Sequence, residues 1–214
     1  MTAESHPVRF VDVHPLVVRV THWVNVVAMA VMIGSGWQIY NASPLFPFTF
    51  PRTITLGTWL GGAIAWHLAG MWLLVGNALV YFGYGLFGRH FMRSFLPLTP
   101  ALFWRDLREA LTLRLRHRLG AYNAVQRLAY LVVLGLGVVA VLSGLSLWKP
   151  VQLHWLASLM GGYEWARRVH FGAMAGIVAF VALHLLLVAL VPRTLLAMLT
   201  GRARIPGDHS EVEL

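Results

Sequence analysis

Four histidines, His22, His67, His170 and His184, stand inside long apolar segments of this chain of 214 residues. Ionisable groups in such segments are costly to place in a membrane and usually serve a function. One histidine alone could simply hydrogen-bond to a neighbouring helix. Four of them, with no Asp, Glu or Lys in the same segments, favour a shared chemical role, and imidazole is a common axial ligand of haem iron.

The spacing of these histidines predicts two pairs. His170 and His184 are fourteen residues apart, so on one helix they lie about 21 Å apart along the axis and point in directions that differ by about 40°. Counted from the arginines expected at the cytoplasmic surface, His22 and His184 lie near that surface, whereas His67 and His170 lie deep towards the outside. We therefore predict His22 opposite His184 and His67 opposite His170, with a b-type haem between the rings of each pair.

One count disagrees with the second pair. Measured from the outer charges, His67 is fifteen residues past Arg52, but His170 is only two residues past Arg168. We follow the cytoplasmic count, because the second apolar segment is long enough to protrude on the outer side.

Composition predicts that these histidines lie on membrane helices. The chain is 58% hydrophobic and 12% charged, whereas a soluble domain carries about 25% charged residues. Crossing a bilayer takes about 20 apolar residues, and the backbone must satisfy its polar groups within a helix. Four segments qualify: residues 16–40, 54–87, 125–148 and 169–191. We predict an all-α integral membrane four-helix bundle, a single domain over residues 1–214 without a convincing internal repeat, with two haems between the helices.

The absence of cysteine narrows the cofactor chemistry. A chain with no cysteine has no disulfide, no cysteine-ligated iron–sulfur cluster, no thiolate-ligated haem and no covalently attached c-type haem.

The positive charge is distributed unevenly. The net charge is +9, and thirteen of the seventeen Lys and Arg residues flank the same side of the predicted helices. This bias predicts that both termini and the long loop 89–126 face the cytoplasm of a bacterial inner membrane. The charge then attracts anionic membrane lipid, and we do not expect nucleic acid as a partner.

Three arginines close to the histidines are candidates for contacts with anionic haem propionates. Arg19 precedes His22 by three residues, and Arg167 and Arg168 stand just before His170. The alternative interpretation of these arginines is that they only set the topology and anchor the helices at the interface.

Several motifs accompany the histidines. They are Arg19-Val20-Thr21-His22-Trp23, Trp66-His67, Tyr122-Asn123-Ala124-Val125-Gln126-Arg127, Ser143-Gly144-Leu145-Ser146-Leu147-Trp148-Lys149-Pro150, and Arg167-Arg168-Val169-His170 with His184 beyond it. In these motifs, and over nearly its whole length, the chain resembles the bacterial di-haem cytochrome b family, the membrane subunits of nickel–iron hydrogenases, formate dehydrogenases and thiosulfate reductases. The four haem ligands of that family fall on His22, His67, His170 and His184.

The resemblance implies electron transfer between a quinone near the cytoplasmic haem and a periplasmic redox protein. The region from Trp148 to His170 is most similar to members that serve periplasmic molybdopterin oxidoreductases. Asn123 and Gln126, at the cytoplasmic start of the third segment, could hydrogen-bond to a quinone carbonyl, or they could cap the helix or bind lipid head groups. The apolar outer segment 150–168 is either a docking surface for the partner or a segment lying on the membrane. Its position directly before His170 favours docking, and we predict that a periplasmic redox protein binds there and exchanges electrons with the haem between His67 and His170.

Two other classes of function stay open. The first is a stand-alone di-haem oxidoreductase that acts on a small oxidant such as superoxide with quinone, with Arg52, Lys149 and Arg167 forming its charged approach. The second is a structural membrane anchor whose histidines only pack. An absorption spectrum separates the anchor from the other two, and a co-purifying partner separates a subunit from a stand-alone enzyme.

Overall fold

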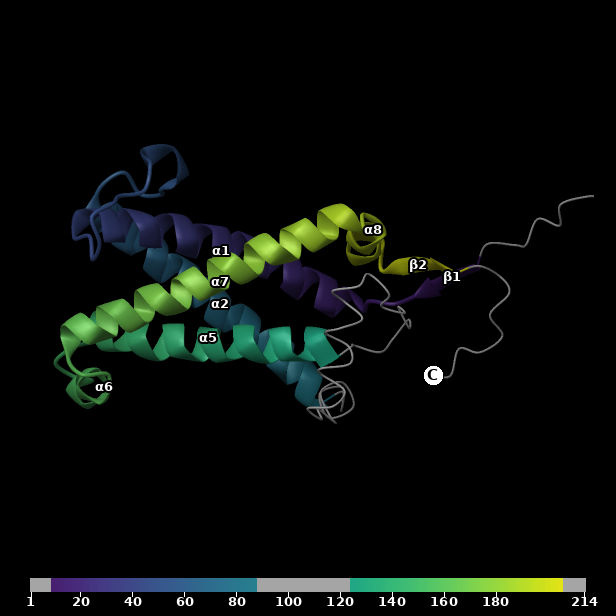
Figure 1. Ribbon diagram of the computed structural model, residues 1–214. Coiled ribbons are helices and arrows are strands. Elements are labelled where there is room, and N and C mark those ends of the chain that lie inside the picture. Colours follow the sequence, from purple (N-terminus) through teal and green to yellow (C-terminus); the bar gives the residue numbers. More distant parts are fainter. Residues whose placement is uncertain (1–8, 88–123, 206–214) are drawn as a thin grey trace, which may run out of the picture.

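The computed structural model describes residues 9–87 and 124–205, and four long helices dominate it (Figure 1). They are α1 (Leu16–Ala42), α2 (Leu60–Phe87), α5 (Ala124–Trp148) and α7 (Tyr163–Leu190). Each contains a stretch long and apolar enough to cross a membrane, with mean hydropathy between 1.5 and 2.6. The predicted all-α integral membrane bundle is confirmed, while most of the predicted loop 89–126 lies outside the described residues.

The four helices form two hairpins. α1 packs closely on α2, and α5 packs closely on α7, whereas described helices of different hairpins approach each other less. Small residues allow the close approach, as is usual in membranes. Ala28 on α1 and Ala63 on α2 are fully buried, and a Cβ added to Gly176 on α7 would stand 2.8 Å from Leu136 of α5.

One end of the bundle, which we call the strand end, brings the two terminal arms together. β1 (Arg9–Asp12) pairs antiparallel with β2 (Arg202–Ile205), and the short helix α8 (Arg193–Thr200) leads into β2. Figure 1 shows β1, β2 and α8 side by side there. The sequence did not predict this pairing, which joins the start of α1 to the chain that follows α7.

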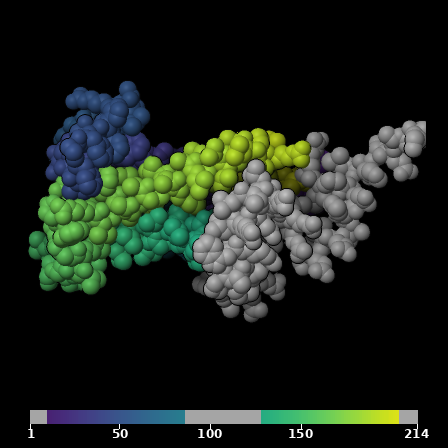
Figure 2. All heavy atoms as spheres, viewed as in Figure 1, coloured from purple at the N-terminus to yellow at the C-terminus, as the bar shows by residue number. Residues whose placement is uncertain are grey.

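The opposite end, the loop end, carries residues 43–59 and the short helix α6 (His154–Leu159). Residues 43–59 include the 3-10 turn η1 (Arg52–Ile54) and lie beside the start of α7 in the space-filling view (Figure 2). Tyr40 of α1 and Phe171 of α7 meet here with ring centres 5.1 Å apart. Aromatic packing therefore joins the two hairpins at this end.

Two helices begin at the loop end at positions other than those predicted. α2 begins at Leu60 instead of residue 54, because Gly57 (φ 105°) and Thr58 (φ 51°) turn the chain in the left-handed region. α7 begins at Tyr163 instead of residue 169, directly after Gly161 (φ 92°) and Gly162 (φ 98°). The prediction counted apolar residues only, and α7 opens with a polar turn. The segment 150–168 is thus α6 followed by the first turns of α7.

Candidate functional site

Within each predicted pair, the two histidines lie at nearly the same depth in their helices. His67 and His170 each follow the first residue of their helix by seven positions. His22 follows the first residue of α1 by six positions, and His184 precedes the last residue of α7 by six. The conflict between the two depth counts therefore disappears, because the outer count started from charges that do not mark the helix starts. A protrusion of the second segment is no longer needed to explain the pairing, because α2 begins only at Leu60.

The histidine rings meet in two pairs that each join one hairpin to the other. At the strand end, His22 of α1 and His184 of α7 have ring centres 6.2 Å apart with planes at 62°. At the loop end, His67 of α2 and His170 of α7 have ring centres 6.3 Å apart with planes at 71°. We call these the strand-end pair and the loop-end pair. α7 contributes one ring to each.

The separation of the rings fits a haem iron between them. Metal bonds to imidazole nitrogen are about 2 Å long, so two imidazoles on opposite sides of one metal ion have ring centres about 6 Å apart. Both observed separations agree with this value. A haem supplies four ring nitrogens to its iron and needs two protein ligands, which is what each pair offers. No group of three or more His, Cys, Asp or Glu suited to a bare metal ion occurs in the described ranges.

The loop-end pair is held from behind by hydrogen bonds. Ser35 Oγ lies 3.0 Å from His67 Nδ1, and Ser143 Oγ lies 3.0 Å from His170 Nδ1. The Ala140 carbonyl also lies 3.0 Å from His170 Nδ1. With Nδ1 engaged on both rings, Nε2 is the nitrogen left to bind a metal.

Glycines allow the serine-bearing helices to come this close. A Cβ added to Gly36 on α1 would stand 3.4 Å from His67 Cε1, and a Cβ added to Gly144 on α5 would stand 3.1 Å from His170 Cε1. Each ring of the loop-end pair is therefore cradled by a Ser–Gly step of the partner helix in its own hairpin.

The indole nitrogen of Trp37, next to Gly36, is buried with no hydrogen-bond partner within residues 9–87 and 124–205. A haem propionate is an acceptor that would suit it.

The strand-end pair has aromatic neighbours instead. Trp23 meets the His22 ring edge-on with centres 5.5 Å apart, and Phe180 stacks on His184 with centres 6.2 Å apart. Within the described part of the chain, no hydrogen bond reaches a ring nitrogen of either histidine. The two pairs thus differ in what supports their rings, although their spacings are nearly equal.

A buried amide lies between α1 and α2 near the strand-end pair. Asn77 is 8% exposed, and its Nδ2 donates to the Thr21 carbonyl at 2.8 Å and to Asn25 Oδ1 at 2.7 Å. Polar groups of this kind are costly in a membrane unless satisfied, so this amide fixes how α2 sits against α1 at the depth of His22.

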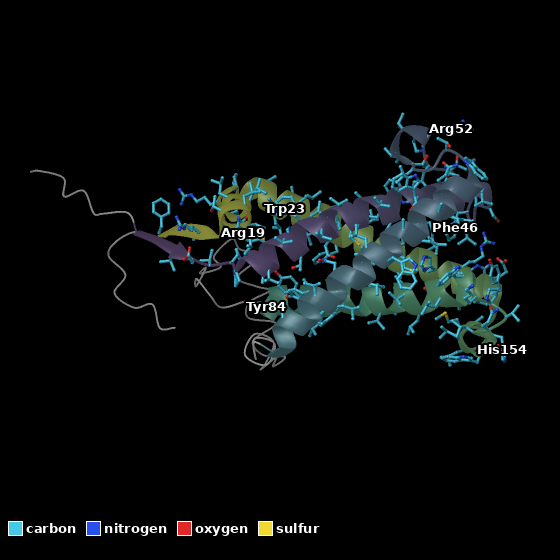
Figure 3. The ribbon with its side chains drawn as sticks, turned by 180° about the vertical axis from the view of Figure 1, so that it is seen from behind. Arg19, Trp23, Phe46, Arg52, Tyr84 and His154 are labelled. Atoms are coloured by element: carbon cyan, nitrogen blue, oxygen red, sulfur yellow. The ribbon has the colours of Figure 1, made fainter. Side chains whose placement is uncertain are left out.

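An apolar groove of about 510 Å³ runs along α1 at the strand end. Arg19 is its charged residue, and Trp23 forms part of its wall. Figure 3 shows both of them towards the strand end, with Phe46, Arg52 and His154 at the loop end. The groove is lined by Leu16, Arg19, Val20, Trp23, Val24, Val27, Leu73 and Leu199. Since Trp23 also touches His22, the groove lies one side chain away from the strand-end pair.

The arginines predicted to contact propionates have protein partners. The guanidinium of Arg19 donates to the carbonyls of Met198, at 3.3 Å, and Leu199 at the end of α8. Arg167 pairs with Glu164 at 3.0 Å and donates to the Ser43 carbonyl at 2.5 Å.

Arg168 lies over the Trp165 ring, 4.9 Å from its centre. Asn123 lies outside the described residues, and of Gln126 only the backbone, within α5, is described. The roles predicted for these five residues stay predictions.

Sequence reasoning missed the contacts of the serines: Ser143 stands in one of the motifs named above, but neither serine was linked to a histidine. Ser35–Gly36 and Ser143–Gly144 occur at matching places on the first helix of each hairpin, and each faces the histidine of the second helix. The two hairpins thus use the same local arrangement, a Ser–Gly step that faces a histidine. A search for small polar residues paired with glycine, one set for each histidine, could have found it.

Two comparisons with known proteins identify relatives of this chain. The family described as prokaryotic cytochrome b561 matches residues 13–201, nearly the whole chain. A protein of Azospira oryzae named putative protein-methionine-sulfoxide reductase subunit YedZ1 is 53% identical over 190 residues, which cover 88% of this chain and 96% of the relative.

Proposed function

The chain belongs to the prokaryotic cytochrome b561 family, and on that premise we propose that it passes electrons across a bacterial inner membrane through two b-type haems. One haem binds between His22 and His184 and the other between His67 and His170. The observation that carries this proposal is the pair of ring separations, 6.2 and 6.3 Å, each joining one hairpin to the other. Haem, when bound, supplies the one-electron chemistry, and the protein supplies ligands, low dielectric and distance.

α7 would determine the separation of the two haem irons, because it carries one histidine of each pair. Both pairs use this one rigid helix, and its two histidines stand about 21 Å apart along the axis. An electron that enters at one pair therefore leaves at the other end of the membrane. In our proposal the strand end faces the cytoplasm, as the distribution of arginines predicts, and the loop end faces the periplasm.

Quinol is the proposed electron donor at the strand end. The apolar groove beside Trp23 offers space for an isoprenoid quinone next to the strand-end pair, and Asn123 and Gln126 remain candidates for hydrogen bonds to a quinone carbonyl. Oxidation of one quinol releases two electrons and two protons, and the electrons would pass one at a time from the site held by His22 and His184 to the site held by His67 and His170.

The partner proposed at the loop end is a reductase of methionine sulfoxide. The relative from Azospira oryzae is named as a subunit of such a reductase. Reduction of one sulfoxide takes two electrons and two protons and releases one water, which matches the two electrons from one quinol. A periplasmic molybdopterin oxidoreductase is the class of partner enzyme implied by the resemblance found in the sequence.

Helix α6 is the proposed docking surface for this partner. Leu156 and Ala157 form the buried face of this helix. Trp155 and Leu159 on α6 are 57% and 78% exposed, and Val151 just before it is 79% exposed. Exposed aromatic and apolar side chains are typical of the centre of an interface.

The alternative function, a stand-alone oxidoreductase, would need a charged approach for its small oxidant. The residues predicted for that approach are partly occupied, because Arg167 is paired with Glu164 and Lys149 lies over the Trp148 ring.

Haem stoichiometry in purified variants tests the ligand assignment. We expect two haems per chain in the wild-type protein, and one in each of His67→Ala and His184→Ala, with different remaining spectra. His154→Ala, on α6, is the matched control and should keep both. A wild-type protein with one haem or none would overturn the proposal.

Reconstituted electron transfer tests the partner. In liposomes with quinol and the reductase, Trp155→Glu together with Leu159→Glu should slow reduction of methionine sulfoxide while both haem spectra stay unchanged. If this variant still couples quinol to the reductase at the wild-type rate, α6 is not the docking surface.

A further inference from the structure

The two serines behind the loop-end pair stand in the same relation to their histidines. Ser35 on α1 faces His67, and Ser143 on α5 faces His170, each with Oγ 3.0 Å from Nδ1. Both serines are fully buried. A buried hydroxyl must find partners inside the protein, and these two use the imidazoles.

The direction of these hydrogen bonds follows from the other contacts of the serines. Ser35 Oγ donates to the Val31 carbonyl at 2.6 Å, and Ser143 Oγ donates to the Val139 carbonyl at 2.6 Å. A hydroxyl has one proton to donate, so each Oγ accepts from the imidazole, and the proton resides on Nδ1. The carbonyl of Ala140, which can only accept, requires the same of His170.

We infer that Ser35 and Ser143 are positioning residues that hold the proton on Nδ1 of His67 and His170 and thereby lower the reduction potential of the loop-end haem. This inference rests on the proposed function, since it needs an iron between the two rings. A hydrogen bond accepted from Nδ1–H makes Nε2 a stronger donor. A stronger donor stabilises ferric iron more than ferrous iron, and second-shell hydrogen bonds are an established means of adjusting haem potentials.

The strand-end pair provides an internal comparison. Its rings contact Trp23 and Phe180 and receive no such hydrogen bond within the described residues. The serines should therefore affect one haem and leave the other unchanged, which a general loss of stability would not do.

The test is a redox titration of Ser35→Ala, Ser143→Ala and the double variant. We expect both haems to stay bound and the potential of the loop-end haem alone to rise. A tenfold change in the ferric–ferrous equilibrium corresponds to 59 mV for one electron. Loss of an outer hydrogen-bond partner typically costs 10–100-fold in metal affinity, and the Ala140 carbonyl still accepts from His170 Nδ1 after Ser143 is replaced. We therefore expect a rise of up to about 59 mV in the double variant. Repeating the titration in a His184→Ala background, which by our proposal keeps only the loop-end haem, assigns the shift.

Ser146→Ala is the matched control. Ser146 lies on the same helix as Ser143 and is also fully buried, but its hydroxyl donates to the Ser143 carbonyl at 2.7 Å. Both potentials should stay at wild-type values in this variant. An equal shift in Ser146→Ala, or unchanged potentials in the double variant with both haems bound, would overturn the inference.

If an alanine variant loses a haem, the corresponding threonine variant, which keeps a hydroxyl on the same carbon, decides the question. Return of the haem and of its potential supports the inference, and continued loss overturns it. The two proposals can fail separately. A wild-type protein without two haems contradicts the proposed function, whereas two haems with unmoved potentials contradict only the role of the serines.

Discussion

Replacing Gly144 with alanine tests whether α5 packs directly against the imidazole of His170. The new Cβ would stand 3.1 Å from His170 Cε1, whereas carbon atoms in favourable contact are about 3.5–4.0 Å apart. Overpacking of this kind costs about 1–3 kcal/mol, and alanine gains only about 0.5–1 kcal/mol over glycine inside a helix. We expect Gly144→Ala to lower the free energy of unfolding by about 1–2 kcal/mol.

Two other glycines give a graded comparison. A Cβ on Gly36 would stand 3.4 Å from His67 Cε1, so the packing penalty is small and roughly cancels the gain from helix propensity. A Cβ on Gly137, also on α5, would meet nothing within 4 Å. The expected order of stability is therefore Gly137→Ala first, wild type and Gly36→Ala together, and Gly144→Ala last.

The assay is thermal unfolding in detergent at one fixed scan rate, followed by loss of the haem Soret band. One kcal/mol shifts the midpoint by about 2–4 °C in a chain of this size, so the outer members of the series should be well separated. If Gly144→Ala melts as high as Gly137→Ala with an unchanged spectrum, the close packing of α5 on His170 is refuted.

Three further predictions concern the strand end. Asn77→Leu removes the donor to Asn25. Hydrogen bonds between membrane helices contribute about 0.6 kcal/mol on average and up to about 1.7 kcal/mol. We therefore expect the free energy of unfolding to fall by about 1–2 kcal/mol, measured in the same thermal assay. Arg19→Met frees the carbonyls at the end of α8, and amide hydrogen exchange in β2 should become faster. Burial, and then the Arg19 guanidinium, lower the pKa of His14 from 6.5. His14 therefore favours folding above about pH 6.5, and this contribution is lost as the pH falls through its lowered pKa. His14→Gln should flatten the dependence of the melting midpoint on pH below about 6.5.

Each of these predictions has its own control and refutation. A melting midpoint unchanged in Asn77→Leu would show that the amide does not hold α2 on α1. Arg202→Ala removes only the exposed ion pair with Asp12, and if it speeds exchange as much as Arg19→Met does, the role assigned to Arg19 is wrong. A pH profile in His14→Gln identical to that of the wild type would contradict the cost of protonating His14.

The membrane helices and the pairing of the histidines followed from the sequence because both depend on strong, local signals. Apolar segments of about 20 residues have few structural alternatives, and the rise per residue of a helix converts spacing into depth. Within each pair, the depths of the two histidines in their helices agree with the depths calculated from the sequence to within one helical turn.

Other features could not be predicted because their causes are not local. β1 and β2 are four residues each and pair across nearly the whole chain, so neither strand has an alternation long enough to recognise. The start of α7 at Tyr163 depends on two glycines with positive φ, and charged residues such as Arg168 lie inside the helix. Ser35 and Ser143 resemble ordinary small residues of membrane helices until the opposing histidine is known.

The shared use of α7 has a consequence for biosynthesis. This helix is the last of the four spans to leave the ribosome, and it carries His170 and His184, one ring of each pair. If the histidines bind haem as proposed, neither haem site is complete until α7 has been inserted beside α1 and α2. Haem capture would thus report that synthesis has passed α7: a chain truncated before this helix would keep only three of the described spans and could not complete either haem site.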